Sequence, residues 1–225
     1  MINWLLIYYP ELLAGIFTTL QLMLGSLVVG FIVALLFACL HHTGKKFFTV
    51  PINVFVFFIR STPLLVQLFL IYYGAAQFSL IRDSFLWPLL KEPFICALIG
   101  LGINSAAYTT VVLKSAMQAI PRGEIEAAKA LGLSPIAILK HIILPRTFII
   151  IWPSYTNEMV LILKATALAS TITLLDIMGV TRQLIAKTYD TLTGLLVAGL
   201  LYVILTLLIV GICHWVSRRF KRVGW

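Results

Sequence analysis

An uncharged apolar segment near the N-terminus restricts the fold of this chain more than any other feature. From Leu12 to Gly44 the sequence contains no Asp, Glu, Lys or Arg. A stretch of about 18 or more apolar residues is long enough to cross a bilayer as a helix. The segment is too long for a cleaved signal peptide and is not preceded by Lys or Arg, so we expect it to remain in the mature protein. It therefore predicts an integral membrane protein.

The rest of the chain continues this pattern. Hydrophobic residues make up 61% of the sequence and charged residues 11%, whereas soluble domains carry about 25% charged residues. Five apolar segments are each near the length of ~20 residues that a spanning helix requires. They cover residues 12–40, 50–74, 93–116, 147–170 and 193–215. We expect a single all-α membrane domain over residues 1–225, with about five transmembrane helices.

The basic residues predict the orientation of these helices. A net charge of +9 would suggest nucleic-acid binding in a soluble protein, but in a membrane protein Lys and Arg concentrate in cytoplasmic connections. Here they gather after the first segment, after the third segment and in the C-terminal tail. We therefore expect an external N-terminus, a cytoplasmic C-terminus and no nucleic-acid partner.

The connection between the third and fourth segments, residues 120–146, is too long for a simple turn and too polar for lipid. Pro121 can open a helix, Gly132 can end one in the left-handed conformation, and Ser134 followed by Pro135 is typical of the start of another. We expect two short helices joined at Gly132. Their apolar residues recur at helical spacing and predict one face that inserts into a groove on a partner. These residues are Ile125, Ala128, Leu131, Ile136, Leu139 and Ile142.

A motif within this loop carries a family resemblance. The residues Glu126, Ala127, Ala128, Gly132, Ile142, Leu144 and Pro145 match every fixed position of the pattern EAA-x3-G-x9-I-x-L-P. The chain thus resembles the permeases of type I ATP-binding-cassette importers. The resemblance implies that the loop is a cytoplasmic coupling helix that docks in a cleft of the ATPase. An ordinary amphipathic surface hairpin is the alternative.

Other segments resemble the polar amino acid branch of these permeases, and in particular its M-type arginine permeases and its histidine permeases. The matching segments are Gly15 with 18–22, then 60–67, 104–108, 157–161, 163–166, 171–179 and 188–190. The resemblance implies a bacterial inner-membrane subunit that pairs with itself or with a sister permease. It also implies a cytoplasmic ATPase dimer that holds ATP and magnesium, a periplasmic substrate-binding protein, and no cofactor on this chain.

Glu158 is the first candidate for a substrate contact. A carboxylate in an apolar span costs several kcal/mol unless it meets a cation, a proton or water, and a basic amino acid would supply the cation. Lys164 lies about 240° around an ideal helix from Glu158 and is not an obvious local partner. Tyr155, one turn earlier, is expected on the same face. The alternative is that Glu158 caps a broken helix or pairs with Arg60.

Three further residues are weaker candidates. Asn104 and Tyr108 are four residues apart on one face of the third span, where they could contact substrate or join neighbouring helices by hydrogen bonds. Arg60 precedes Pro63, which marks an interruption of the second span. Freed carbonyl groups could line a cavity there, although a proline can also produce only a kink.

Other functions leave no signal in the sequence. Gly44 and Lys45 do not complete a phosphate-binding loop, because Cys39 occupies the position of its first glycine. No spacing indicates a catalytic triad or a metal site. A membrane-embedded enzyme and an ion channel remain the rival classes, and histidine or glutamine are the alternative substrates to arginine. We expect the energy source to lie on another polypeptide.

Overall fold

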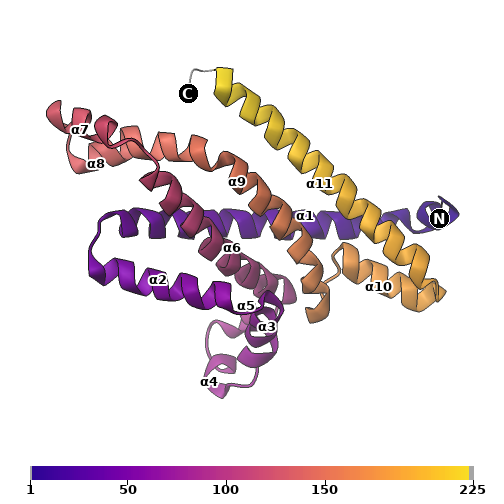
Figure 1. Cartoon of the computed structure of the whole chain (residues 1–225). Coiled ribbons are helices and arrows are strands. Elements are labelled where there is room, and N and C mark those ends of the chain that lie inside the picture. Colours follow the sequence, from indigo (N-terminus) through magenta and orange to yellow (C-terminus); the bar gives the residue numbers. More distant parts are fainter. Residues whose placement is uncertain (1, 223–225) are drawn as a thin grey trace.

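The computed structural model describes residues 2–222, and across these residues all regular structure is helical (Figure 1). The long helices are α1 (Ile2–His42), α2 (Lys46–Ser61), α6 (Pro93–Gln118), α9 (Leu144–Ala165) and α11 (Thr191–Arg222). The shorter ones are α3 (Leu64–Phe69), η1 (Leu70–Gly74), α4 (Ser79–Arg82), α5 (Trp87–Leu90), α7 (Arg122–Ala130), α8 (Pro135–Ile138), η2 (Leu139–Ile143), η3 (Thr166–Ile172) and α10 (Ile177–Thr188).

Within residues 2–222, four helical stretches are long and apolar enough to cross a membrane. They are Ile7–His42, Pro93–Gln118, Pro135–Ile172 and Thr191–Arg218. The pair Lys46–Ser61 and Leu64–Gly74, bent by 102°, makes a fifth if it is counted as one span. The prediction of about five transmembrane helices is confirmed. The stretch Pro135–Ile172 is longer than the span predicted over residues 147–170, because α8, η2, α9 and η3 follow one another without a loop.

Small residues allow α1 and α6 to lie close together. A Cβ atom at Gly30 would lie 2.8 Å from Cβ of Ser105, and one at Gly102 would lie 3.3 Å from a methyl group of Val29. In a membrane, where lipid is as apolar as Leu, such close approach lets van der Waals contacts hold helices together. α9 packs on α6, and the two cross α1 in Figure 1. Helices α6 and α9 also form two walls of the candidate site.

The predicted interruption of the second span is confirmed at Thr62 and Pro63, which separate α2 from α3. The Gln67 side-chain amide donates hydrogen bonds to the carbonyl oxygens of Ile59 at 2.8 Å and Thr62 at 3.3 Å, and to the Thr62 hydroxyl at 2.7 Å. Backbone groups freed by a break in a membrane helix must find partners within the protein. Gln67 therefore stabilises the bend by satisfying these acceptors.

Helix α10 lies where the sequence predicted only a connection. Its N-terminus is capped by Asp176, whose carboxylate accepts from the Gly179 amide at 2.9 Å and from the Tyr202 hydroxyl of α11 at 3.1 Å. The Ile177 amide donates to the Thr19 hydroxyl of α1 at 3.0 Å. These buried contacts hold α10 against both long helices. In Figure 1, α10 and the N-terminus lie at the right, far from the α7–α8 pair at the left.

Candidate functional site

A pocket of about 360 Å³ lies between α6, α9 and the bend that joins α2 to α3. It is lined by Thr62, Pro63, Leu64, Asn104, Tyr108, Glu158, Leu161, Ile162 and Ala165. Small-molecule sites in proteins measure about 300–1,000 Å³ and combine apolar walls with a few polar groups. The pocket fits this description, and three of its polar residues come from two different spans.

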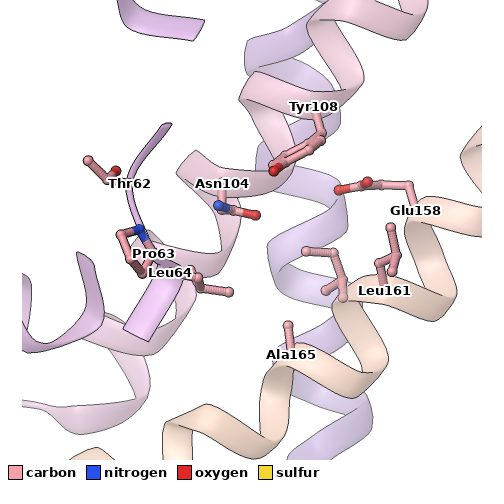
Figure 2. A pocket seen from close by; sticks show the side chains of 9 residues that line it. Thr62, Pro63, Leu64, Asn104, Tyr108, Glu158, Leu161 and Ala165 are labelled. Carbon is pink, nitrogen blue, oxygen red and sulfur yellow. The ribbon is translucent and has the colours of Figure 1, made fainter. Parts of the chain in front are cut away.

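Glu158 is the charged group of this pocket. Its side chain is 8% exposed, and Figure 2 shows the carboxylate directed from α9 toward the side of the pocket where Asn104 and Tyr108 lie. Among the side chains that the structure describes, those of residues 7–218, none forms an ion pair with Glu158. A buried carboxylate without a cation is costly in a membrane, so the site favours a positively charged ligand.

Asn104 and Tyr108 line the same wall of the pocket, one turn apart on α6. The guanidinium carbon of Arg60 lies 4.9 Å from the centre of the Tyr108 ring, within the range of a cation–π interaction. Arg60 therefore contacts Tyr108 at the border of the pocket and is not in an ion pair with Glu158. The site thus combines a buried anion with a cation at its border.

Tyr155 is turned away from the pocket. Its hydroxyl donates to the Leu27 carbonyl oxygen of α1 at 3.3 Å, and its ring meets the Phe31 ring edge-on at 5.1 Å. Tyr155 and Leu161 are each three residues from Glu158 and lie about 60° to either side of it on an ideal helix, and the pocket is on the Leu161 side. Conversely, Leu161 and Ala165 line the pocket although sequence reasoning missed them. Their spacing of three and seven residues from Glu158 was the available signal.

The 120–146 loop contains the predicted helix boundaries. α7 begins directly after Pro121, Gly132 has a left-handed φ of 80°, and the Ser134 hydroxyl accepts from the Ala137 amide at 3.3 Å. The two helices joined at Gly132 are therefore confirmed. Glu124 of α7 forms an ion pair with Arg146 at 2.7 Å, which fixes the loop to the start of α9.

The predicted single apolar face of this loop is wrong. Ala128 is 3% exposed and packs, together with Ile125, Leu139 and Ile142, on the chain's own core. Leu131 and Ile136 are 82% and 77% exposed and do not pack on that core, although Leu131 lines the same hollow as Ala128 and Ile142. Several motif residues nevertheless gather around one hollow of about 350 Å³. They are Ala127, Ala128, Ile142 and Pro145, while Glu126 and Gly132 are exposed beside them and Leu144 is half-buried.

The outer surface of α9 differs from the exposed surfaces of α1 and α11. Ser154, Asn157 and Lys164 are exposed along it at helical spacing, and Leu161 of the pocket lies between the last two. Lys164 forms no ion pair among the described residues. By contrast, every exposed side chain of α1 from residue 24 to 36 and of α11 from 195 to 212 is apolar. The α9 surface is unsuited to lipid, and the pocket opens beside it.

A polar pocket between membrane spans is a feature that a transport protein requires and a simple membrane anchor does not. Residues 42–222 match the family described as "Binding-protein-dependent transport system inner membrane component", and the chain belongs to that family.

Curated relatives extend the match over nearly the whole chain. The arginine ABC transporter permease protein ArtM of Haemophilus influenzae is 44% identical over 215 residues, covering 96% of this chain and 92% of the relative. ArtM of Escherichia coli is 40% identical over 221 residues, covering 94% and 95%. The nopaline transport system permease protein NocM of Agrobacterium fabrum is 40% identical over 202 residues, covering 89% and 84%.

Solved structures agree with the fold. A chain of the structure described as "Crystal structure of an amino acid ABC transporter with histidines" superposes with a TM-score of 0.84 at 27% identity, and the match covers 96% of both chains. A chain of the MetNI methionine ABC transporter superposes with a TM-score of 0.77 at 19% identity, which shows the fold alone. The predicted all-α permease fold of type I importers is confirmed, and the chain is an inner-membrane permease subunit of an ABC transporter.

Proposed function

We propose that this permease imports basic amino acids, with arginine favoured, and that Glu158 is the contact for the cationic side chain. The observation that carries the proposal is a buried carboxylate that faces a pocket and has no cationic partner among the described residues. A guanidinium group can form two parallel hydrogen bonds to a carboxylate, which favours arginine over a point charge.

The other polar groups suit the backbone end of an amino acid. Arg60 at the pocket border supplies positive charge for the substrate carboxylate, and Asn104 and Tyr108 supply hydrogen-bonding groups between the two charged residues. Two ArtM relatives, whose names assign them to arginine, support arginine as the substrate. Histidine is the second candidate, since a structural neighbour is described with histidines. Glutamine would leave the Glu158 charge without a partner.

A second permease chain, either another copy or a sister permease, covers the polar α9 surface in this proposal. Ser154, Asn157 and Lys164 are polar side chains on a membrane span, and such groups face protein or water rather than lipid. Because the pocket opens beside this surface, the second chain would enclose the substrate. The two permease chains would then form the substrate path between them.

In this proposal the 120–146 loop couples ATP hydrolysis by the ATPase to transport by this chain. Leu131 and Ile136 are exposed apolar side chains beside the Gly132 turn, and they provide the surface that an ATPase cleft would cover. ATP and magnesium are held by that ATPase dimer, and a periplasmic binding protein delivers the substrate. The loop and the C-terminus lie in the cytoplasm and the N-terminus in the periplasm, as the distribution of Lys and Arg favours. Residues 1–225 act as one permease domain.

The substrate class is tested by ATP-dependent uptake of radiolabelled arginine into vesicles that contain the whole complex. Excess unlabelled arginine and histidine should compete, whereas glutamine should not. Leu161→Trp should fill the pocket and abolish uptake, while Leu207→Trp, on the apolar surface of α11, should leave it intact. Equal competition by glutamine would refute a cation site, and uptake by the Leu161→Trp complex would refute the pocket.

A further inference from the structure

A second hollow lies between α6 and α9, nearer to the 120–146 loop than the pocket that contains Glu158. It measures about 430 Å³, within the range of small-molecule sites. It shares no lining residue with the Glu158 pocket. We call it the inner hollow, and it is lined by Val111, Val112, Ser115, Ala116, Ala119, Ile150, Ile151 and Ser154.

The Glu158 pocket and the inner hollow follow one another along the same two helices. On α9, Ser154 is four residues before Glu158, and on α6, Ser115 is seven residues after Tyr108. Steps of four and seven residues return a side chain to within about 40° of the same face of an ideal helix, and they advance it by about 6 and 10 Å. Both steps lead toward the α7–α8 pair, which joins α6 to α9 (Figure 1). The inner hollow therefore continues the Glu158 pocket toward the 120–146 loop.

Two serine hydroxyls distinguish the inner hollow from a surface that faces lipid. Serine and threonine within helices often donate to the carbonyl oxygen four residues earlier, as Thr110 of α6 does at 2.6 Å and Thr147 of α9 at 2.7 Å. Neither Ser115 nor Ser154 forms a hydrogen bond with any residue that the structure describes. A hydroxyl without a partner in a membrane span needs water or a polar ligand, because lipid cannot satisfy it. The inner hollow is thus suited to a polar molecule.

The lining of the inner hollow carries no charge, in contrast to that of the Glu158 pocket. Lys114 precedes Ser115 in the sequence, but its ammonium group donates to the Asn53 side chain of α2 at 2.8 Å. Without a counter-charge, the inner hollow binds a cationic amino acid less tightly than Glu158 does. Sites along a transport path must bind well enough to be entered and weakly enough to be left. A neutral site after a charged one meets this requirement.

We propose that the inner hollow is a second, weaker binding site for the transported amino acid, which occupies it after leaving Glu158. A hydroxyl both donates and accepts hydrogen bonds, so Ser115 and Ser154 can contact the carboxylate and the ammonium group of an amino acid. This inference rests on the proposed function, because it takes the imported amino acid as the ligand. It does not require that the amino acid is arginine.

The test measures how fast a cationic methanethiosulfonate reagent labels Ala119→Cys in the purified whole complex, with the wild-type complex as the blank for the native cysteines. At about ten times its apparent Kd, arginine should slow the labelling about tenfold. Adding Ser115→Ala or Ser154→Ala should raise that Kd about tenfold, through the loss of one hydrogen bond. Adding Leu161→Trp, which fills the Glu158 pocket, should leave the protection by arginine in place. Ser79→Cys, exposed on α4, is the control, and arginine should not slow its labelling.

Four outcomes overturn the proposal. Arginine may fail to protect the introduced thiol, or both alanine variants may leave the apparent Kd unchanged. Loss of protection in Leu161→Trp would assign the effect to arginine in the Glu158 pocket, and a thiol that is never labelled would show that a second permease chain covers the inner hollow. If Ala119→Cys does not assemble, Ile150→Cys, at an exposed position of the same hollow, replaces it. If the complex imports glutamine instead of arginine, the proposed function fails, and the same labelling with glutamine still tests the inner hollow.

Discussion

Replacing Gly132 with valine should uncouple ATP hydrolysis from transport. Gly132 adopts φ = 80°, and a Cβ atom built there meets nothing within 4 Å. The substitution therefore causes no clash, and its whole effect is the strain of a β-branched residue in the left-handed conformation. That strain costs about 1–2 kcal/mol for an ordinary side chain. A free energy of this size lowers the ratio of the native turn to other conformations by a factor of about 5–30.

The consequence can be measured as arginine imported per ATP hydrolysed in vesicles that contain the complex. If the turn positions the loop against the ATPase, the arginine imported per ATP should fall, by at most the same factor of about 5–30. Gly132→Asn should be milder, because asparagine tolerates the left-handed conformation better than valine does.

Two glycines provide controls. Gly44→Val introduces the same strain at φ = 70° in the α1–α2 turn, outside the 120–146 loop, and Gly123→Val changes α7 itself at a position without a left-handed φ. Both variants should retain the wild-type ratio. An unchanged ratio in Gly132→Val, or an equal fall in Gly44→Val, would refute a specific role of the turn in coupling.

Two stability predictions follow from buried hydrogen bonds. Gln67→Leu removes the donor that serves the carbonyl groups at the α2–α3 bend, which should cost about 1–3 kcal/mol, while Gln77→Leu at an exposed position should cost little. Tyr202→Phe removes the hydroxyl that donates to the buried Asp176 carboxylate and should cost about 1.5–3 kcal/mol, compared with no loss for Tyr189→Phe at a residue 90% exposed. Thermal unfolding of the purified protein measures the stability of all four variants. If Gln67→Leu or Tyr202→Phe is no less stable than its control, the stabilising role assigned to that hydrogen bond is contradicted.

Local patterns in the sequence were sufficient for the spans and for the helix boundaries of the 120–146 loop. Charge-free length identifies a membrane helix, and Pro121, Gly132 and Ser134 act on the backbone of their own residues or near neighbours. Such effects do not depend on tertiary contacts. They can therefore be read before the fold is known.

Contacts between residues far apart in the sequence explain why helix α10 was not predicted and why the apolar face of the 120–146 loop was predicted wrongly. Helix α10 is too short and too polar for a span, and the residues that hold it, Thr19 and Tyr202, are far away in the sequence. The face of the loop was also misjudged, because helical spacing shows that Ala128 and Leu131 recur as apolar residues but not whether each meets the chain's own core or solvent.

The candidate pocket was predictable in part. Glu158, Asn104 and Tyr108 stood out as polar residues within apolar spans, and the structure brings them together. The wall formed by Thr62 to Leu64 depends on the direction of a 102° bend, which Gln67 stabilises from the following helix. Sequence spacing contains no information on that direction.

The most direct test of the proposed function is ATP-dependent uptake of radiolabelled arginine by complexes that carry Glu158→Gln or the control Glu92→Gln. Each change removes one negative charge, but Glu92 is exposed and lies outside the pocket, at the start of α6. We predict that Glu158→Gln assembles normally and loses arginine uptake while Glu92→Gln transports as the wild type. Wild-type arginine uptake by an assembled Glu158→Gln complex would contradict a cation site at Glu158.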